Sequence, residues 1–289
     1  MAGRDSSVRV SPIWLVLIGI LSVQFGAGVA KTLFDEVAPT TIVWLRLVAS
    51  ALVLLAVARP ALRGRTGQDW MVVLAFGLAL GLMNWSIYQS FARIPIGLAV
   101  TIEFVGPLTL AVLGSRRPRD LLWVGLAGLG VLLLGLQPGD LTWAGVGFAL
   151  LAAATWAAYI LLSAQTGRRW PGVDGLAVAS LVATLLLTPL ALGRYAGELA
   201  DGRILLLGAL VGLLSSVIPY TCELVALRSM EPAVFSILMS VEPAAAALAG
   251  LVVVHEVLGP LQLLAMACVV VASVGATRSG ATISEPVPD

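Results

Sequence analysis

Charge, cysteine and histidine are all scarce in this chain of 289 residues. Only 11% of the residues are Asp, Glu, Lys or Arg, and the chain has two cysteines and one histidine. Cys222 and Cys268 have neither CxxC spacing nor a neighbouring histidine, so we expect them to be apolar filler and expect no metal site. The sequence also lacks HExxH, GxSxG and phosphate-loop motifs, which argues against an enzyme and implies no cofactor.

Hydrophobic residues take the place of charge. They make up 59% of the chain, and the mean hydropathy of the chain is +1.00. Soluble domains of this size do not have such a high value. Most of the apolar runs are long enough to cross a hydrocarbon core of about 30 Å as helices. We therefore predict an all-α polytopic membrane protein with ten transmembrane helices, a lipid bilayer as its surroundings and no nucleic-acid partner. The runs are Ile13–Leu33, Thr40–Ala58, Trp70–Ala92, Pro95–Gly114, Leu121–Leu136, Trp143–Gln165, Val173–Leu192, Ile204–Arg228, Pro232–Val253 and Pro260–Ala276.

The 17 Lys and Arg residues fix the expected orientation. Basic residues are enriched in the cytoplasmic loops of membrane proteins. With the N-terminus in the cytoplasm, the larger group lies inside, a smaller group of Lys31, Arg93, Arg194 and Arg203 lies outside, and Arg46 lies within a span. Both termini are therefore predicted to be cytoplasmic. The inner group is Arg4, Arg9, Arg59, Arg63, Arg65, Arg116, Arg117, Arg119, Arg168, Arg169, Arg228 and Arg278.

The first apolar run has some features of a signal peptide. Arg4 and Arg9 precede it, and residues 28–30 form an acceptable cleavage site. The run is long for a signal peptide and contains Gln24 and Lys31, so we expect it to be retained as a span.

Ten spans divide into two halves of five, which an odd number of crossings per half would make antiparallel. We predict repeats over residues 13–137 and 142–277, between a cytoplasmic N-terminus (1–12) and a disordered cytoplasmic tail (278–289). The pair Gly77 and Gly81 in the third span recurs as Gly208 and Gly212 in the eighth, and such GxxxG pairs let helix backbones approach closely. Inverted repeats are typical of transporters that bind substrate near the membrane midplane.

Two glutamates lie deep in corresponding spans. Glu103 is roughly 12 Å from the outer end of the fourth span and Glu242 roughly 15 Å from the inner end of the ninth, at about 1.5 Å per residue. A charge at this depth costs on the order of 2.5–3.5 kcal/mol, so such residues usually face a cavity. We predict that both bind a substrate amine or a proton, the alternative being a protonated carboxyl satisfied by a neighbouring helix. Pro107 and Pro243 should kink the same helices, and each kink should leave a backbone carbonyl group without its helical partner. These carbonyl groups line the site, or else the kinks are purely structural.

Other polar and aromatic residues of the spans are candidates for the same site. Glu223, after Pro219 and Tyr220, is expected to be an inner-gate residue or an interfacial carboxylate. Arg46 and Lys31 are expected to snorkel to the interface, or else one of them meets a substrate carboxylate or an acid such as Glu103. Tryptophans near span ends read as interfacial anchors: Trp14, Trp70, Trp123, Trp143 and Trp170. The polar and aromatic candidates are Gln24, Asn84, Tyr88, Trp156, Tyr159 and Tyr220.

Six strings in order along the chain carry a resemblance to a known family: residues 24–31, 81–84, 103–107, 115–118, 219–223 and 238–243. The chain resembles the threonine/homoserine exporter branch of the drug/metabolite transporter superfamily, whose halves are EamA domains. The resemblance implies two inverted five-helix repeats in a bacterial inner membrane and amino-acid export driven by proton entry. His255 stands where the family usually has glycine before the glutamate, here Glu256, that starts the last helix.

The leading hypothesis is a secondary exporter of threonine- or homoserine-like amino acids that works by proton antiport and alternating access, as a monomer or homodimer. Its partners would be the small-molecule substrate and the proton, with Glu103 and Glu242 as their sites. An exporter of drugs, purines or other metabolites is the alternative. An intramembrane enzyme or a scaffold is the hypothesis from another class.

Overall fold

The structure, a computed structural model, describes residues 11–113, 121–135, 141–227, 230 and 232–278, so most of both predicted terminal segments lies outside it. The described chain is helical and contains no strand. The long helices are α1 (Pro12–Thr32), α2 (Pro39–Ala58), α3 (Gly67–Phe91), α7 (Trp143–Gly167), α8 (Asp174–Arg194) and α13 (Pro260–Arg278). The shorter elements are α4 (Ile96–Glu103), α5 (Val105–Leu113), α6 (Leu121–Gly135), η2 (Ala196–Ala200), α9 (Gly202–Gly212), the π-helical turn η3 (Leu213–Val217), α10 (Ile218–Leu227), α11 (Pro232–Met239), α12 (Glu242–Ala249) and the π-helical turn η4 (Gly250–Val254).

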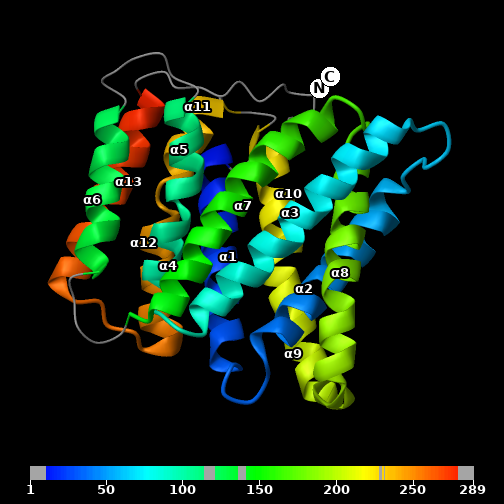
Figure 1. Cartoon of the computed structure of the whole chain (residues 1–289), viewed down its shortest axis with the longest axis horizontal. Helices are drawn as coiled ribbons and strands as arrows, with labels where there is room; N and C mark the ends of the chain where they lie inside the picture. The colour runs from blue at the N-terminus through cyan, green and yellow to red at the C-terminus, as the bar shows by residue number, and fades with distance from the viewer. Residues whose placement is uncertain (1–10, 114–120, 136–140, 228–229, 231, 279–289) are drawn as a thin grey trace, which may run out of the picture.

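Eight helical segments of the described chain are long and apolar enough to cross a membrane. Two shorter apolar helices, Ile96–Leu110 and Leu121–Leu133, coincide with the fourth and fifth predicted spans. The prediction of an all-helical polytopic membrane protein is confirmed. In Figure 1, α1 begins and α13 ends at the same end of the bundle, which we call the termini face; the opposite end is the far face.

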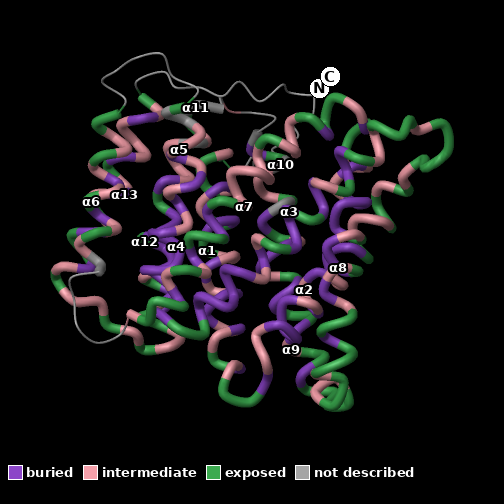
Figure 2. The backbone as a smooth tube through the Cα atoms, in the orientation of Figure 1, coloured by how far each residue is buried: buried purple, intermediate pink, exposed green. Residues whose placement is uncertain are grey.

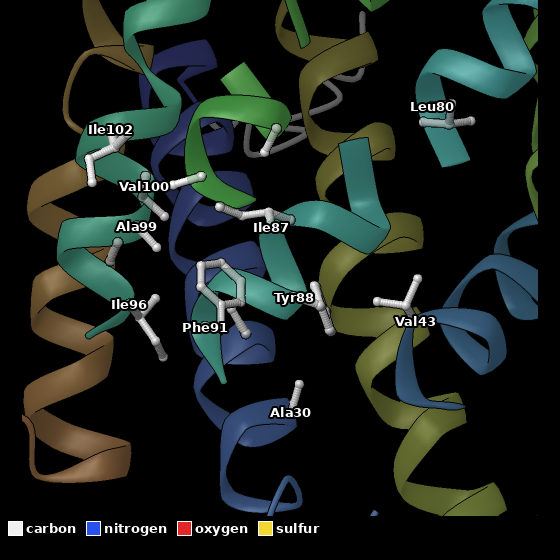
Figure 3. Packing of buried hydrophobic residues seen from close by; sticks show 14 of the residues in the cluster. Ala30, Val43, Leu80, Ile87, Tyr88, Phe91, Ile96, Ala99, Val100 and Ile102 are labelled. Carbon is white, nitrogen blue, oxygen red and sulfur yellow. The ribbon is translucent and has the colours of Figure 1, made fainter. Parts of the chain in front are cut away.

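The core of the bundle is apolar, and so is much of its outside. Buried residues run along the inner sides of the helices, while exposed residues cover the periphery (Figure 2). Leu132 and Leu206, for example, are 71% and 70% exposed, as expected for side chains that face lipid. Figure 3 shows part of the core, where Tyr88 of α3 lies between Val43 of α2 and Ile96 of α4.

The paired glycines lie where helices cross closely. A methyl group on Gly77 would be 2.5 Å from the Val182 Cβ atom and 2.8 Å from the Ala179 carbonyl oxygen, both on α8. One on Gly212 of α9 would be 2.7 Å from the Ala49 Cβ atom on α2. Gly81 likewise faces α8, and Gly208 faces Leu45 of α2. The third span thus packs on the seventh, and the eighth packs on the second.

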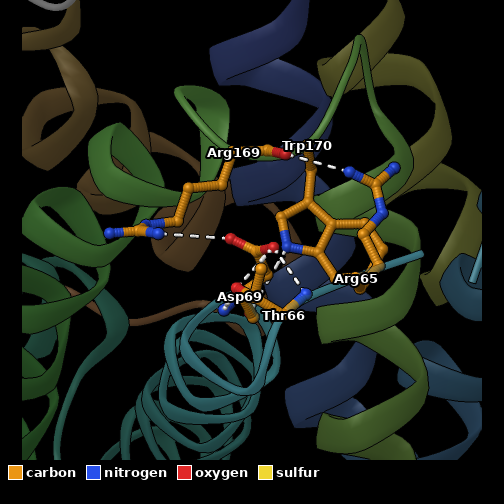
Figure 4. A network of polar contacts seen from close by, with 5 residues as sticks. All are labelled: Arg65, Thr66, Asp69, Arg169 and Trp170. Carbon is orange, nitrogen blue, oxygen red and sulfur yellow. Dashed lines mark hydrogen bonds and ion pairs between the residues drawn. The ribbon is translucent and has the colours of Figure 1, made fainter.

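A polar network joins the first and second halves, between the start of α3 and the loop after α7 (Figure 4). Both segments lie at the termini face (Figure 1). Asp69 accepts a hydrogen bond from the Thr66 backbone at 2.9 Å and pairs with Arg169 at 3.2 Å. The Arg65 guanidinium lies 4.3 Å from the centre of the Trp170 ring and donates to the Arg169 carbonyl oxygen at 3.0 Å. Trp170 is only 1% exposed, so its prediction as an interfacial anchor is wrong. Tertiary packing between α3 and α8 encloses this ring.

Close helix packing makes the Gly77 position testable. Gly77→Ala should lower the free energy of unfolding by about 1–3 kcal/mol, because the added methyl group would force α3 away from the α8 backbone. Gly147→Ala is the matched control, since nothing lies within 4 Å of a methyl group there. Thermal unfolding in detergent should show a lower melting temperature for Gly77→Ala alone. Equal melting temperatures for the two variants would contradict this packing.

Candidate functional site

Two spans are interrupted at a glutamate. The fourth span breaks at Phe104, directly after Glu103 at the end of α4, and the ninth breaks at Ser240 and Val241, directly before Glu242 at the start of α12. Pro107 and Pro243 were expected to bend continuous helices, but each lies in the first turn of the segment that follows the break. Proline is tolerated in a first turn because the N–H group it lacks has no partner within the helix there.

Glu242 lies within electrostatic range of two other carboxyl groups, each on a different helix. Glu242 is 8% exposed and interacts electrostatically with Glu103 of α4 and with Glu223 of α10. The Gln24 side chain on α1 hydrogen-bonds to the Glu242 carboxyl. The structure therefore brings together three predicted acids and the predicted glutamine. No His, Cys, Asp and Glu side chains of the described chain form a group of three that could hold a metal ion.

Arg46 of α2 turns into the protein instead of reaching the interface. Its Nη2 atom donates to the Ser215 carbonyl oxygen at 2.9 Å. Weaker contacts of 3.4 Å run from Nε to the Ser216 hydroxyl and from Nη1 to the Tyr88 hydroxyl. The guanidinium also acts electrostatically on Glu103. Arg46 thus connects Glu103 with Tyr88 of α3 and with Ser215 of η3.

The π-helical turn η3 supplies groups that the sequence analysis missed. Ser215 and Ser216 are 2% and 3% exposed, within an otherwise apolar stretch. The Ser22 hydroxyl of α1 donates to the Leu214 carbonyl oxygen at 2.6 Å, and Gly26 leaves room for the Ser215 hydroxyl. π-helical turns are frequent at functional sites because they change which carbonyl groups are free. Two adjacent serines inside a membrane span were the available signal.

The predicted aromatic and amide residues divide between the site and its surroundings. Tyr88 is buried against Phe34 and Phe91, with ring centroids 6.1 and 5.5 Å away. Asn84 is buried and donates to the Leu80 carbonyl oxygen of its own helix at 2.8 Å. Asn84 and Tyr88 are four residues apart and therefore lie on the same face of α3. The side chain of Tyr220 lies outside the described part of the structure.

Trp156 and Tyr159 lie on α7. The Trp156 ring meets Phe104, the residue at the break of the fourth span, edge-on at 5.2 Å. Tyr159 contacts Phe76 at 5.1 Å and lines a small cavity of about 90 Å³ with Thr166. Trp156 thus adjoins the acidic group, and Tyr159 lies farther toward the termini face.

Lys31 belongs to a separate cluster at the far face, which we call the far-face latch (Lys31, Ile94, Ile96 and Glu256). Lys31 Nζ lies 2.5 Å from Glu256 Oε1 and donates to the Ile94 carbonyl oxygen at 2.7 Å. The Ile96 N–H, at the start of α4, donates to Glu256 Oε2 at 2.9 Å. The latch therefore joins the ends of α1, α4 and η4. Lys31 thus pairs with an acid, as the alternative to snorkelling supposed, and that acid is Glu256.

Helix contacts close the same end of the bundle. A methyl group on Gly97 of α4 would lie 2.9 Å from the Ala247 Cα atom of α12. Another on Gly250 would lie 2.7 Å from Glu256 Oε2, so a side chain there would displace the latch carboxylate. The far-face halves of the two broken spans are thus in close contact beneath the latch.

Comparisons with known proteins agree with this architecture. Residues 143–278 match the EamA-like transporter family. The chain is 37% identical to the threonine/homoserine exporter RhtA of Escherichia coli (strain K12) and 38% identical to that of Salmonella typhimurium (strain LT2). Each match covers 94% of both chains. A solved crystal structure matches in fold, with a TM-score of 0.62 and 20% identity over 92% of this chain and 97% of its own.

The chain therefore belongs to the EamA-like transporter family, in the branch that contains the threonine/homoserine exporters. It is a multi-pass bacterial membrane protein.

Proposed function

We propose that this protein exports small amino acids of the threonine or homoserine type by proton antiport with alternating access. The observation that carries the proposal is the placement of Glu103 and Glu242 at two helix breaks inside the membrane-spanning bundle, with Gln24 of α1 beside Glu242. Ionisable residues at such places mark substrate and ion pathways. The names of the RhtA relatives supply the substrate class.

The proposal includes ten spans in two inverted repeats, residues 13–137 and 142–277. Reciprocal packing supports it, since α3 lies on α8 and α9 lies on α2. The breaks in the fourth and ninth spans occupy corresponding places in the two halves. We assign the termini face to the cytoplasm because two described loops that carry arginines lie there, the α2–α3 loop with Arg65 and the α7–α8 loop with Arg169 (Figure 1).

Exchange between substrate and proton follows from shared carboxyl groups. The ammonium group of an amino acid would bind Glu242 and Glu103, and a proton would occupy the same groups when the carrier is empty. Occupancy by one excludes the other, which couples export of the amino acid to entry of the proton. A ligand shifts the carrier between its two conformations only to the extent that it binds them differently.

Alternating access requires that the far face open and close. In this structure the far-face latch and the contact of α4 with α12 close that face. We assign this conformation to a state sealed from the outside. Release of the amino acid then requires the Lys31–Glu256 ion pair to break.

Counterflow in proteoliposomes tests the function and the role of the acids. Wild-type protein should accumulate labelled threonine or homoserine against the unlabelled compound, and a pH gradient should change the rate. Glu103→Gln and Glu242→Gln should each reduce pH-coupled transport at least tenfold, about 1.4 kcal/mol. Glu36→Gln is the control, because Glu36 is exposed and paired with Arg203.

Normal, pH-responsive counterflow by both glutamine variants would overturn the assignment of the acids. Accumulation of purines or drugs in place of amino acids would overturn the proposed substrate class and favour the alternative exporter.

The far-face latch predicts a change in local opening. Lys31→Met should leave Glu256 unpaired and loosen the first turn of α4, whose Ile96 N–H the carboxylate accepts. Hydrogen exchange of residues 95–100 should accelerate about fivefold, equivalent to roughly 1 kcal/mol of lost protection. Arg203→Gln, which breaks the exposed pair with Glu36, is the control and should leave that segment unchanged. Unchanged exchange in Lys31→Met would show that the latch does not hold α4.

A further inference from the structure

Arg46 is a half-buried cation without an ion-pair partner in the described chain. The ion pairs found there join Lys31 with Glu256, Arg169 with Asp69 and Arg203 with Glu36. Arg46 lies about 10 Å along α2 from the far-face end of the helix, at 1.5 Å per residue, which is within the membrane-spanning part. A cation at such a depth needs a functional or structural reason.

The contacts of Arg46 hold the guanidinium in place without neutralising it. Its acceptors are the Ser215 carbonyl oxygen and the hydroxyl groups of Ser216 and Tyr88, all of them uncharged. These contacts engage three of the five N–H groups that a guanidinium carries, and two of the three are long. The remaining N–H groups suit a carboxylate, which arginine can bind with two parallel hydrogen bonds.

Two further buried polar atoms nearby have no partner in the described part of the chain. They are the Ser215 hydroxyl oxygen, next to the carbonyl group that Arg46 binds, and the Gln24 side-chain carbonyl oxygen. Their residues are 2% and 3% exposed. A buried polar group without a hydrogen bond destabilises the protein, and a polar ligand would relieve that cost. A hydroxyl donor and a carbonyl acceptor match the two ends of a zwitterion.

We propose that Arg46 binds the carboxylate of the transported amino acid, while the Gln24 and Glu242 end of the site binds its ammonium group. The inference rests on the proposed function and deepens it, because it makes the α-carboxylate a required part of the substrate. Glu103 lies within electrostatic reach of both ends, next to Arg46 and next to Glu242. The site thus selects zwitterions over simple amines.

Inhibition of threonine counterflow tests the carboxylate-binding end of the site separately from the ammonium-binding end. The inhibitors are unlabelled threonine and threoninol, in which a CH₂OH group replaces the carboxylate. Threoninol should inhibit the wild-type protein at least tenfold more weakly than threonine. A site built to bind a group discriminates strongly against an analogue that lacks it, because its own polar groups are then left unpaired.

Variants show which residues distinguish threonine from threoninol. Arg46→Lys should weaken inhibition by threonine about tenfold, because the lysine keeps the charge but lacks the planar pair of N–H donors. In the same variant, inhibition by threoninol should stay within twofold of its wild-type value. Ser216→Ala retains Arg46 and removes the hydroxyl group that accepts from its Nε atom. It should therefore weaken inhibition by threonine less than Arg46→Lys does and leave inhibition by threoninol nearly unchanged. Arg194→Lys is the control, since Arg194 is exposed at the end of α8.

Each outcome has a separate meaning. Equal inhibition of the wild type by threonine and threoninol would overturn the role of Arg46 and leave amino-acid export intact. Equal weakening of both compounds by Arg46→Lys would assign Arg46 a purely structural role, such as a partner for Glu103. Failure of threonine and homoserine to inhibit or exchange in folded wild-type protein would overturn the proposed function and this inference together.

Discussion

The cost of placing ionisable side chains inside a membrane-spanning bundle is the constraint on which the centre of this structure depends. Each such charge costs on the order of 2.5–3.5 kcal/mol, and this centre contains Glu103, Glu242 and Arg46. The helix breaks at Phe104 and at Ser240 and Val241, together with the π-helical turn η3, place polar backbone and hydroxyl groups beside them. Irregular backbone is tolerated at membrane depth only where protein or a polar cavity surrounds it. The departures from regular helix therefore coincide with the candidate site.

The contacts at the two ends of the bundle differ in kind. At the termini face, Trp170 is enclosed by Arg65 and Trp70, and the ion pair of Asp69 with Arg169 lies beside this aromatic contact. At the far face, one ion pair and a few hydrogen bonds hold α1, α4 and η4 together. The Lys31 and Glu256 side chains are 16% and 15% exposed, and those of Arg169 and Asp69 are 30% and 15% exposed. The proposed export would break the Lys31–Glu256 ion pair and the contact of α4 with α12 at the far face.

Much of the architecture could be predicted from the sequence, because hydrophobic length is a local property. The apolar runs predicted the helical segments, and the depth of Glu103 and Glu242 along those runs predicted that both acids lie well inside the bundle. Contacts between distant segments could not be predicted in this way. The pairing of Lys31 with Glu256, the inward turn of Arg46 and the burial of Trp170 all depend on helices far apart in the chain. The same holds for η3, because a π-helical turn has no simple residue pattern.

Calorimetry of threonine binding, in buffers that differ in ionisation enthalpy, tests most directly whether amino acid and proton share the carboxyl groups of Glu103 and Glu242. If they do, binding to the purified protein releases a proton, and the measured heat changes linearly with the ionisation enthalpy of the buffer. A binding heat that is the same in every buffer would mean that no proton leaves when threonine binds. That result would contradict exchange at Glu103 and Glu242.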